Sequence, residues 1–147
     1  MASRSKSKVY FFFLNNAFSF RNRISVKRFI ETVFKKENRR LGEISYIFCS
    51  DVDLLALNKK FLSHNYYTDI LTFNLSGDSD EINAEIYISI DRIKENAVFL
   101  KTPYQQELFR VMIHGILHLC GYSDHTPRKK GIMRKKENYY LSRLSFT

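Results

Sequence analysis

The order in which strand-like and helix-like segments follow one another constrains the fold of this chain more than any other feature. Short apolar or alternating segments predict four β-strands, at 9–14, 44–48, 70–75 and 85–90. Apolar residues three and four positions apart predict helices at about 25–39, 51–61, 91–100, 102–119 and 128–144. This order is typical of α/β and α+β domains, and we favour α+β, with a four-stranded mixed sheet packed against about five helices.

Residues at the ends of these segments predict where two of the helices begin. Ser25 stands before an apolar stripe and is expected to cap the first helix, and Gly42 follows the point where that helix should end. Thr102 and Gln105 have the spacing of a capping box, and Pro103 occupies the position of a first helical residue. These signals predict the start of the helix that carries the two histidines discussed below.

The size and charge of the chain limit what it does. Its 147 residues, 44% of them hydrophobic, suffice for one domain with a sizeable core, and no repeat or Pro/Gly/Ser-rich linker divides them. A net charge of +9 favours a polyanionic partner, with nucleic acid as the first expectation. We expect residues 1–147 to form a single domain, with the basic start, 1–8, as a disordered tail.

The sequence carries neither a membrane-spanning segment nor a disulfide framework. The apolar run near the start, 9–14, is far shorter than the roughly 20 residues that a transmembrane helix needs. The two cysteines, Cys49 and Cys120, are interpreted as buried thiols of a reducing compartment. We therefore expect a cytoplasmic protein without a membrane partner, while the oligomeric state is left open.

One segment has the pattern of a metal site: His114-Gly-Ile-Leu-His118-Leu-Cys-Gly121-Tyr-Ser-Asp124-His125. Histidines four positions apart on a helix project from the same face, one turn apart. Gly121 stands where the helix should end, and Asp124 and His125 follow as candidate third ligands. Two imidazoles on a helix and a third ligand brought back by a turn leave one position open for water, as in catalytic zinc sites. The segment therefore predicts a divalent metal site.

The residue after the first histidine limits the reactions that such a metal site could catalyse. Zinc peptidases with this histidine spacing carry a glutamate there as general base, whereas this chain has Gly115. An ordinary peptidase mechanism is therefore not expected. A metal-dependent hydrolase whose substrate is not RNA, but a peptide or a small molecule, remains an alternative, which the positive charge of the chain disfavours.

With these residues in view, the chain resembles the YbeY family of bacterial metal-dependent endoribonucleases and rRNA maturation factors. The family motif has a histidine and a glycine, a second histidine four positions on, then a leucine, a glycine and a third histidine. Five residues match it: His114, Gly115, His118, Leu119 and Gly121. Counted without a gap, the third histidine falls on Asp124, whereas a one-residue insertion would place it on His125. The ungapped count favours Asp124, and His125 is the alternative.

A second block of the resemblance precedes the third predicted strand. Thr68 and Asp69 match a threonine–aspartate pair of the family and are expected to form the cleft wall beside the metal. The family commonly has an arginine shortly before this pair, thought to assist the reaction, but this chain has Leu62 there. His64 lies close by and is a candidate substitute, although an ordinary surface histidine is the commoner interpretation.

Basic residues gather in the last predicted helix, where Met133 and Glu137 also match the family. Beside a hydrolytic metal, such a run is expected to hold the RNA backbone, although many such runs are only solvated helix faces. The residues assigned to RNA binding are Arg128, Lys129, Lys130, Arg134 and Lys135, and Lys136 continues the run. Tyr139 and Tyr140 are candidates for stacking on unpaired bases, but a core role is the commoner use of such residues.

The resemblance implies a single-strand-specific, metal-dependent endoribonuclease that acts on rRNA precursors in ribosome maturation and quality control. His114, His118 and Asp124 would hold one Zn²⁺ per chain, and the histidines would act through water bound to the metal. A non-enzymatic ribosome-associated factor with a structural metal is a second alternative, because Leu62 stands where the family has an arginine thought to assist the reaction.

Overall fold

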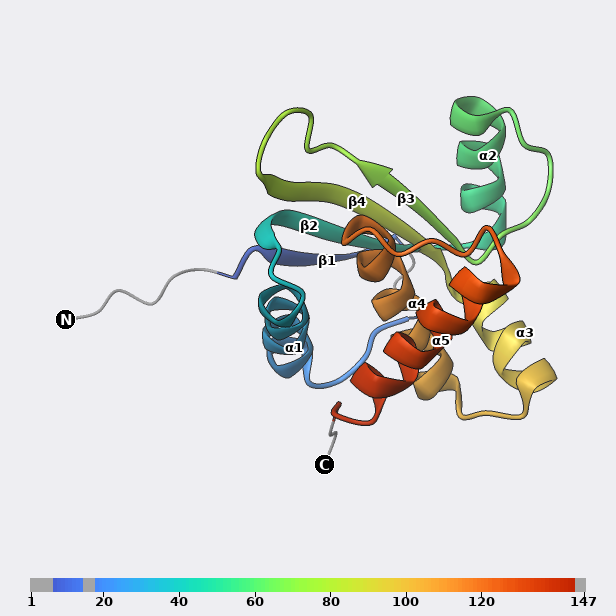
Figure 1. The fold of residues 1–147 in the computed structure, drawn as a ribbon. Helices are drawn as coiled ribbons and strands as arrows, with labels where there is room; N and C mark the ends of the chain where they lie inside the picture. The colour runs from blue at the N-terminus through green and yellow to red at the C-terminus, as the bar shows by residue number, and fades with distance from the viewer. Residues whose placement is uncertain (1–6, 15–17, 145–147) are drawn as a thin grey trace.

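The computed structural model describes residues 7–14 and 18–144, in which strands and helices follow in the predicted order (Figure 1). Four strands of this part of the chain form one sheet: β1 (Val9–Phe13), β2 (Arg40–Cys49), β3 (Ile70–Asn74) and β4 (Glu81–Ser89). Five helices accompany it within the same residues: α1 (Arg23–Lys36), α2 (Asp51–Leu62), α3 (Ile90–Leu100), α4 (Tyr104–Leu119) and α5 (Pro127–Leu141). The predicted α+β fold, with a four-stranded mixed sheet and about five helices, is confirmed.

The sheet is mixed because its strands are joined in two ways. In the order β1-β2-β4-β3, the first three strands run parallel, and β3 lies antiparallel to β4 at the edge. Parallel neighbours need a crossover connection, which α1 provides between β1 and β2. A short turn joins β3 to β4, and this pair is therefore antiparallel.

Helices cover both faces of the sheet. Alternate residues of β4, such as Ile86 and Ile88, point into the larger core, which they share with buried residues of α1, α4 and α5. On the other face, Leu54 of α2 belongs to a smaller apolar cluster with Cys49 and Leu71. Figure 1 accordingly shows α2 apart from the group formed by α1, α4 and α5. The loop that leaves α2 thus comes to the sheet from the side opposite α4.

Helix α4 lies close against the sheet because a glycine faces it. A side-chain carbon at Gly115 would lie 2.9 Å from Cδ1 of Ile70 and 3.4 Å from Cγ2 of Ile86. The hydroxyl of Tyr46, in β2, also donates a hydrogen bond to the carbonyl of Met112 at 2.9 Å. Because Gly115 directly follows His114, this packing fixes where that histidine lies relative to β3.

Two of the predicted helix starts and one predicted helix end differ in detail from the structure. Asn22, with φ of 63°, precedes α1, so Ser25 lies inside the first turn, and Gly42 lies inside β2. Pro103 precedes α4 without a side-chain capping hydrogen bond, and the hydroxyl of Thr102 is buried without a partner among the described residues. Helix α4 therefore begins without the capping box that the sequence predicts.

The start of the chain is only partly described. Most of the predicted disordered tail, 1–8, lies outside the described residues. Its last two residues make contacts: Ser7 Oγ donates to the carboxylate of Glu31 at 2.9 Å, and Lys8 Nζ donates to the carbonyl of Leu41 at 3.2 Å. Within 7–14 and 18–144, no helix has the length and apolar character needed to cross a membrane.

Candidate metal centre and active site

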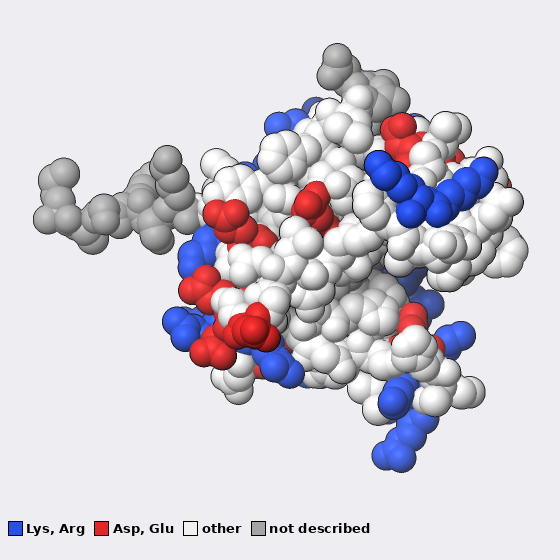
Figure 2. Space-filling view, turned by 90° about the horizontal axis from the view of Figure 1, so that it is seen from above, with Lys and Arg blue, Asp and Glu red and all other residues white. Residues whose placement is uncertain are grey.

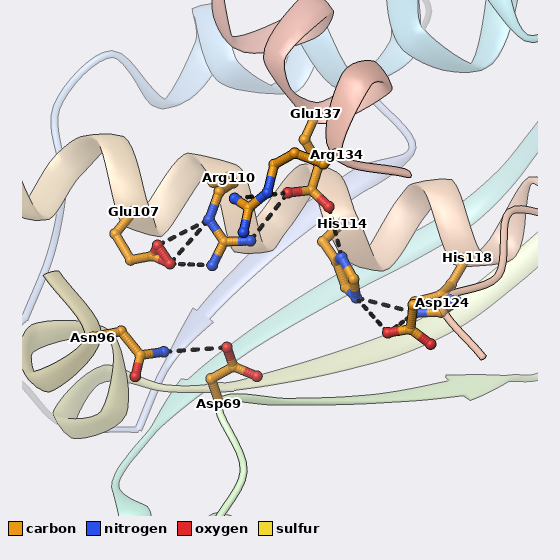
Figure 3. Close-up of polar contacts among 9 residues, drawn as sticks. All are labelled: Asp69, Asn96, Glu107, Arg110, His114, His118, Asp124, Arg134 and Glu137. Carbon is orange, nitrogen blue, oxygen red and sulfur yellow. Dashed lines mark hydrogen bonds and ion pairs between the residues drawn. The ribbon is translucent and has the colours of Figure 1, made fainter. Parts of the chain in front are cut away.

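The two histidines predicted as metal ligands converge on one point with a carboxylate (Figure 3). His114 and His118 lie one turn apart on α4, and their Nε2 atoms are 3.0 Å from each other. Oδ2 of Asp124, in the loop after α4, lies 3.6 Å from each of these nitrogens. One ligand atom from each of the three residues lies within 4.8 Å of the others. This is the group that the ungapped motif predicts.

Hydrogen bonds on the far side of each ring assign its tautomer. Nδ1 of His114 lies 2.9 Å from a carboxylate oxygen of Glu137, and Nδ1 of His118 lies 3.0 Å from the carbonyl oxygen of Tyr122. A carboxylate and a carbonyl only accept, so Nδ1 carries the proton in both neutral rings and Nε2 is a bare acceptor. Two bare nitrogens and a carboxylate therefore face one another with no donor among them. A divalent cation fits this donor set.

Burial keeps His118 in the form that a metal ligand needs. Burial lowers the pKa of His118 from its ordinary value, and the neighbouring His114 lowers it further, although Asp124 opposes both effects. Metals bind the neutral imidazole, so a lowered pKa reduces competition from protons. The environment of His118 thus favours metal binding near neutral pH.

His114 is oriented by a buried chain of charges, which we call the buried charge chain: Glu107, Arg110 and Glu137. The Nε atom of Arg110 donates to both carboxylate oxygens of Glu107, at 3.0 and 2.9 Å, and its Nη1 donates to Glu137 at 3.0 Å. Glu137 then accepts from His114 with its other oxygen. Both glutamates are buried. Such outer partners fix the tautomer and the direction of a ligating histidine.

The chain of hydrogen bonds also holds Glu137 ionised. Burial alone would raise the pKa of Glu137, but hydrogen bonds from His114 and Arg110 outweigh it and lower the pKa. An ionised carboxylate is a pure acceptor, which agrees with the tautomer assigned to His114. Sequence comparison placed Glu137 in the last helix but gave it no role, and Glu107 and Arg110 went unnoticed. The sequence does contain a signal for these two residues, because Glu107 and Arg110 place two charges, three positions apart, on the otherwise apolar face of α4.

The loop that carries Asp124 is anchored to α1 and α5. Gly121 ends the helical region with φ of 106°, as the predicted helix end requires. The hydroxyl of Tyr122 donates to Glu37 at 2.7 Å, and Glu37 also accepts from Tyr140 and, at 3.2 Å, from Lys136. Because the carbonyl of Tyr122 accepts from His118, this anchor also helps to position one of the candidate metal ligands.

His114, His118 and Asp124 could hold a metal ion, and we call them the metal group. The metal group opens into a cavity of about 670 Å³, the main cavity, within the usual size range of ligand sites. Thr68 and Asp69, the predicted cleft wall, line it together with the alternative ligand His125. Burial raises the pKa of Asp69, although Arg110 and His114 act against this shift. Its side chain accepts a hydrogen bond from Asn96 at 3.3 Å (Figure 3). His125 lines the cavity but does not belong to the three-atom group found among the described residues.

The predicted RNA-binding residues divide into two sets. Lys130 and Arg134 line a smaller cavity of about 180 Å³ that shares His114 and Asp124 with the main cavity, and we call this the basic cavity. The other three, Arg128, Lys129 and Lys135, are exposed on α5 but line neither of the two cavities. Figure 2 shows, from above, a largely uncharged centre, with most of the acidic side chains on the left, where basic ones lie among them, and mainly basic side chains on the right. The structure thus brings two of the five basic residues to the metal group.

The two tyrosines of α5 differ in environment. Tyr140 is buried and donates a hydrogen bond to Glu37, so the core role considered from the sequence is confirmed. For Tyr139 the core role is wrong, because this residue is 39% exposed, and the cations of Lys36, Lys136 and Arg143 lie over its ring. Neither tyrosine lines the main cavity.

The fold and the site define a single-domain α+β protein with a histidine–carboxylate group that could hold a metal ion in an open cleft. Comparison with known families gives this class a name: the model of the family Endoribonuclease YbeY matches residues 15–145. An Endoribonuclease YbeY of Cytophaga hutchinsonii is 44% identical over 138 residues, which cover 94% of this chain and 96% of the relative. That of Flavobacterium psychrophilum is 46% identical over 124 residues, 84% of this chain and 88% of the relative.

The chain is also similar to a protein of solved structure. The solution structure of the protein TM1509 from Thermotoga maritima matches with a TM-score of 0.61 at 26% identity, over 92% of this chain and 88% of that protein. The chain therefore belongs to the YbeY family of endoribonucleases. The family predicted from the sequence is confirmed, and endoribonuclease activity, a hydrolase reaction on RNA, is the activity for which the family and its relatives are named.

Proposed function

We propose that the protein is a zinc-dependent endoribonuclease that cleaves single-stranded RNA, with rRNA precursors and the ribosome as its targets in the cytoplasm. Maturation of rRNA and ribosome quality control are the processes that this activity would serve. The observation that carries the proposal is the convergence of three acceptors, from His114, His118 and Asp124, without a donor among them. Such a set is stabilised by a cation, and nitrogen and carboxylate ligands suit zinc.

The residues around the cleft have separate roles in this proposal. His114, His118 and Asp124 would hold a divalent ion, which would supply Lewis acidity to phosphodiester hydrolysis. The buried charge chain keeps the tautomer and direction of His114 fixed, and the Tyr122 carbonyl does the same for His118. Thr68 and Asp69 form the cleft wall, and Lys130 and Arg134 bind phosphates of the substrate.

The openness of the site favours a catalytic over a structural metal. The side chains of His118 and Asp124 are 33% and 39% exposed and face the main cavity. Structural zinc sites are closed by four protein ligands, whereas catalytic sites keep a position for water or substrate. With three ligands beside a cavity, the group resembles the catalytic type.

Cleavage of a defined RNA by the purified full-length protein tests the proposal. We expect internal cuts in a single-stranded RNA, little cutting of a duplex of the same sequence, loss of activity with EDTA and recovery when zinc is restored. Activity that EDTA leaves unchanged would contradict the metal. Loss of folding with EDTA, in a protein that never cleaves RNA, would favour the non-enzymatic factor with a structural metal.

A further inference from the structure

The loop between α2 and β3 places two aromatic rings in the main cavity, opposite α4. His64 and Tyr66 both line the cavity that contains His114, His118 and Asp124. Their rings are stacked, with centroids 5.0 Å apart and planes inclined by 21°. The Tyr66 hydroxyl and Nδ1 of His64 are also within hydrogen-bond distance, at 2.9 Å. Tyr66 is nevertheless 56% exposed, so its ring is accessible from the cleft.

A buried asparagine holds the loop that presents these rings. The main-chain carbonyl of Asn58 accepts from the His64 amide at 3.1 Å, and its side-chain amide donates to the carbonyl of Tyr66 at 2.9 Å. Asn58 itself is buried in α2. Two hydrogen bonds from one fixed residue therefore order the backbone, while the rings remain exposed. A rigid exposed ring loses little entropy when it binds a flat ligand.

The distribution of charge assigns different parts of a nucleotide to the two cavities. None of the described residues that line the main cavity is lysine or arginine, whereas Arg110, Lys130 and Arg134 line the basic cavity. His114 and Asp124 belong to both. An RNA strand that crosses the metal group can therefore place a phosphate on the basic side and a base on the aromatic side.

We propose that His64 and Tyr66 form a stacking platform for one unpaired base next to the cleaved phosphodiester; the inference rests on the proposed endoribonuclease function. Stacking on an aromatic ring accepts every base, because each has a flat face. A base inside a helix is already stacked and paired, and it must be released before it reaches such a ring. The platform thus selects single-stranded RNA without selecting its sequence.

The next residue along the chain provides a matched control. Tyr67 is 53% exposed, almost as much as Tyr66, but it does not line the main cavity. Its ring lies under the guanidinium of Arg92, at 5.3 Å from the ring centroid. Replacing Tyr67 therefore removes an exposed tyrosine from the same loop without removing a ring from the platform.

The test is a titration of single-stranded RNA that contains 2-aminopurine, a base whose fluorescence falls when it stacks. The full-length protein is used with EDTA to prevent cleavage, and a hairpin duplex serves as the second ligand. We expect Tyr66→Ala to weaken single-strand binding about tenfold and to abolish the quenching. Tyr66→Phe and Tyr67→Ala should retain both, and duplex binding should change less than twofold.

The salt dependence of binding separates stacking from a general loss of structure. The slope of log K against log salt should be the same for Tyr66→Ala and wild type, because no phosphate contact is removed. Unchanged single-strand affinity and quenching in Tyr66→Ala, in a protein that binds and cleaves RNA, would overturn the platform alone. Equal losses in Tyr66→Ala and Tyr67→Ala would also overturn it. A wild-type protein that neither binds nor cleaves RNA would overturn the proposed function as well.

Discussion

The main cavity forms a cleft whose two walls differ in charge and in exposure to solvent. Behind His114, the wall built by α4 and α5 contains the buried charge chain, in which every charge has a close partner. Across the main cavity, the loop after α2 presents exposed aromatic rings and is held through its backbone by Asn58. Metal ligands need fixed directions, which buried, paired charges provide, whereas a surface that meets RNA must remain accessible.

The largest effect, on the free energy of unfolding, should come from a substitution in the buried charge chain. Glu137→Ala leaves the guanidinium of Arg110 and the Nδ1 proton of His114 without their shared acceptor, which should cost about 3 kcal/mol or more of the free energy of unfolding. His64→Ala, on the exposed wall, should change it by about 0.5 kcal/mol or less. Urea unfolding with EDTA present measures both without a contribution from bound metal. Similar losses in the two variants would remove the distinction between the walls.

The third ligand should give the next largest effect. Asp124→Ala should weaken zinc binding at least about tenfold, or about 1.4 kcal/mol, because its Oδ2 atom lies 3.6 Å from both Nε2 atoms. His125→Ala is the matched control from the same loop and should change the affinity less than about twofold, since only Asp124 of the two belongs to the converging group among the described residues. A zinc titration with the reverse ranking would assign the site to three histidines.

The basic cavity predicts a smaller effect, seen in salt dependence. Lys130→Ala combined with Arg134→Ala should reduce the slope of log K against log salt for single-stranded RNA by about 1.4, at about 0.7 per phosphate contact. Lys59→Ala with Lys60→Ala removes the same charge from α2, at residues that line neither of the two cavities, and should leave the slope nearly unchanged. Equal changes in both double variants would mean that net charge alone attracts RNA.

The smallest effect concerns the anchor of the ligand loop. Burial would raise the pKa of Glu37, but hydrogen bonds from Tyr140, Tyr122 and Lys136 lower it from its ordinary 4.5. The stabilisation is therefore present above about pH 4.5 and is lost as the pH falls through the lowered pKa of the folded state. Glu37→Gln should make the loss of stability in acid shallower than in wild type, measured by urea unfolding with EDTA. Parallel curves would show that Glu37 titrates alike in both states.

The same contrast explains what the sequence could predict. The order of elements and the pair His114 and His118 follow from local periodicity, and both agree with the structure. Asp124 was favoured by counting along the family motif, and it lies at the point where the histidines converge. These features depend on neighbours within a few positions, which a sequence displays directly.

The remaining features depend on contacts between distant segments. Glu37 lies 85 positions from Tyr122 and Glu137 lies 27 from Arg110, so no local pattern joins them. Helices α1 and α4 follow Asn22 and Pro103 instead of the predicted capping residues, and neither of the two makes a side-chain capping hydrogen bond. Most helical stability in proteins comes from tertiary packing, so a local capping signal does not fix where a helix begins. The division of the basic run of α5 into two cavity residues and three others likewise follows only from how α5 packs on α4.

Metal content tests the central claim most directly. The claim is that the converging acceptors of His114, His118 and Asp124 hold one metal ion per chain. Elemental analysis of purified wild-type protein should give about one zinc per chain, and the double variant His114→Ala/His118→Ala should contain almost none while its circular dichroism shows the fold retained. Full retention of metal in the folded double variant would contradict the account.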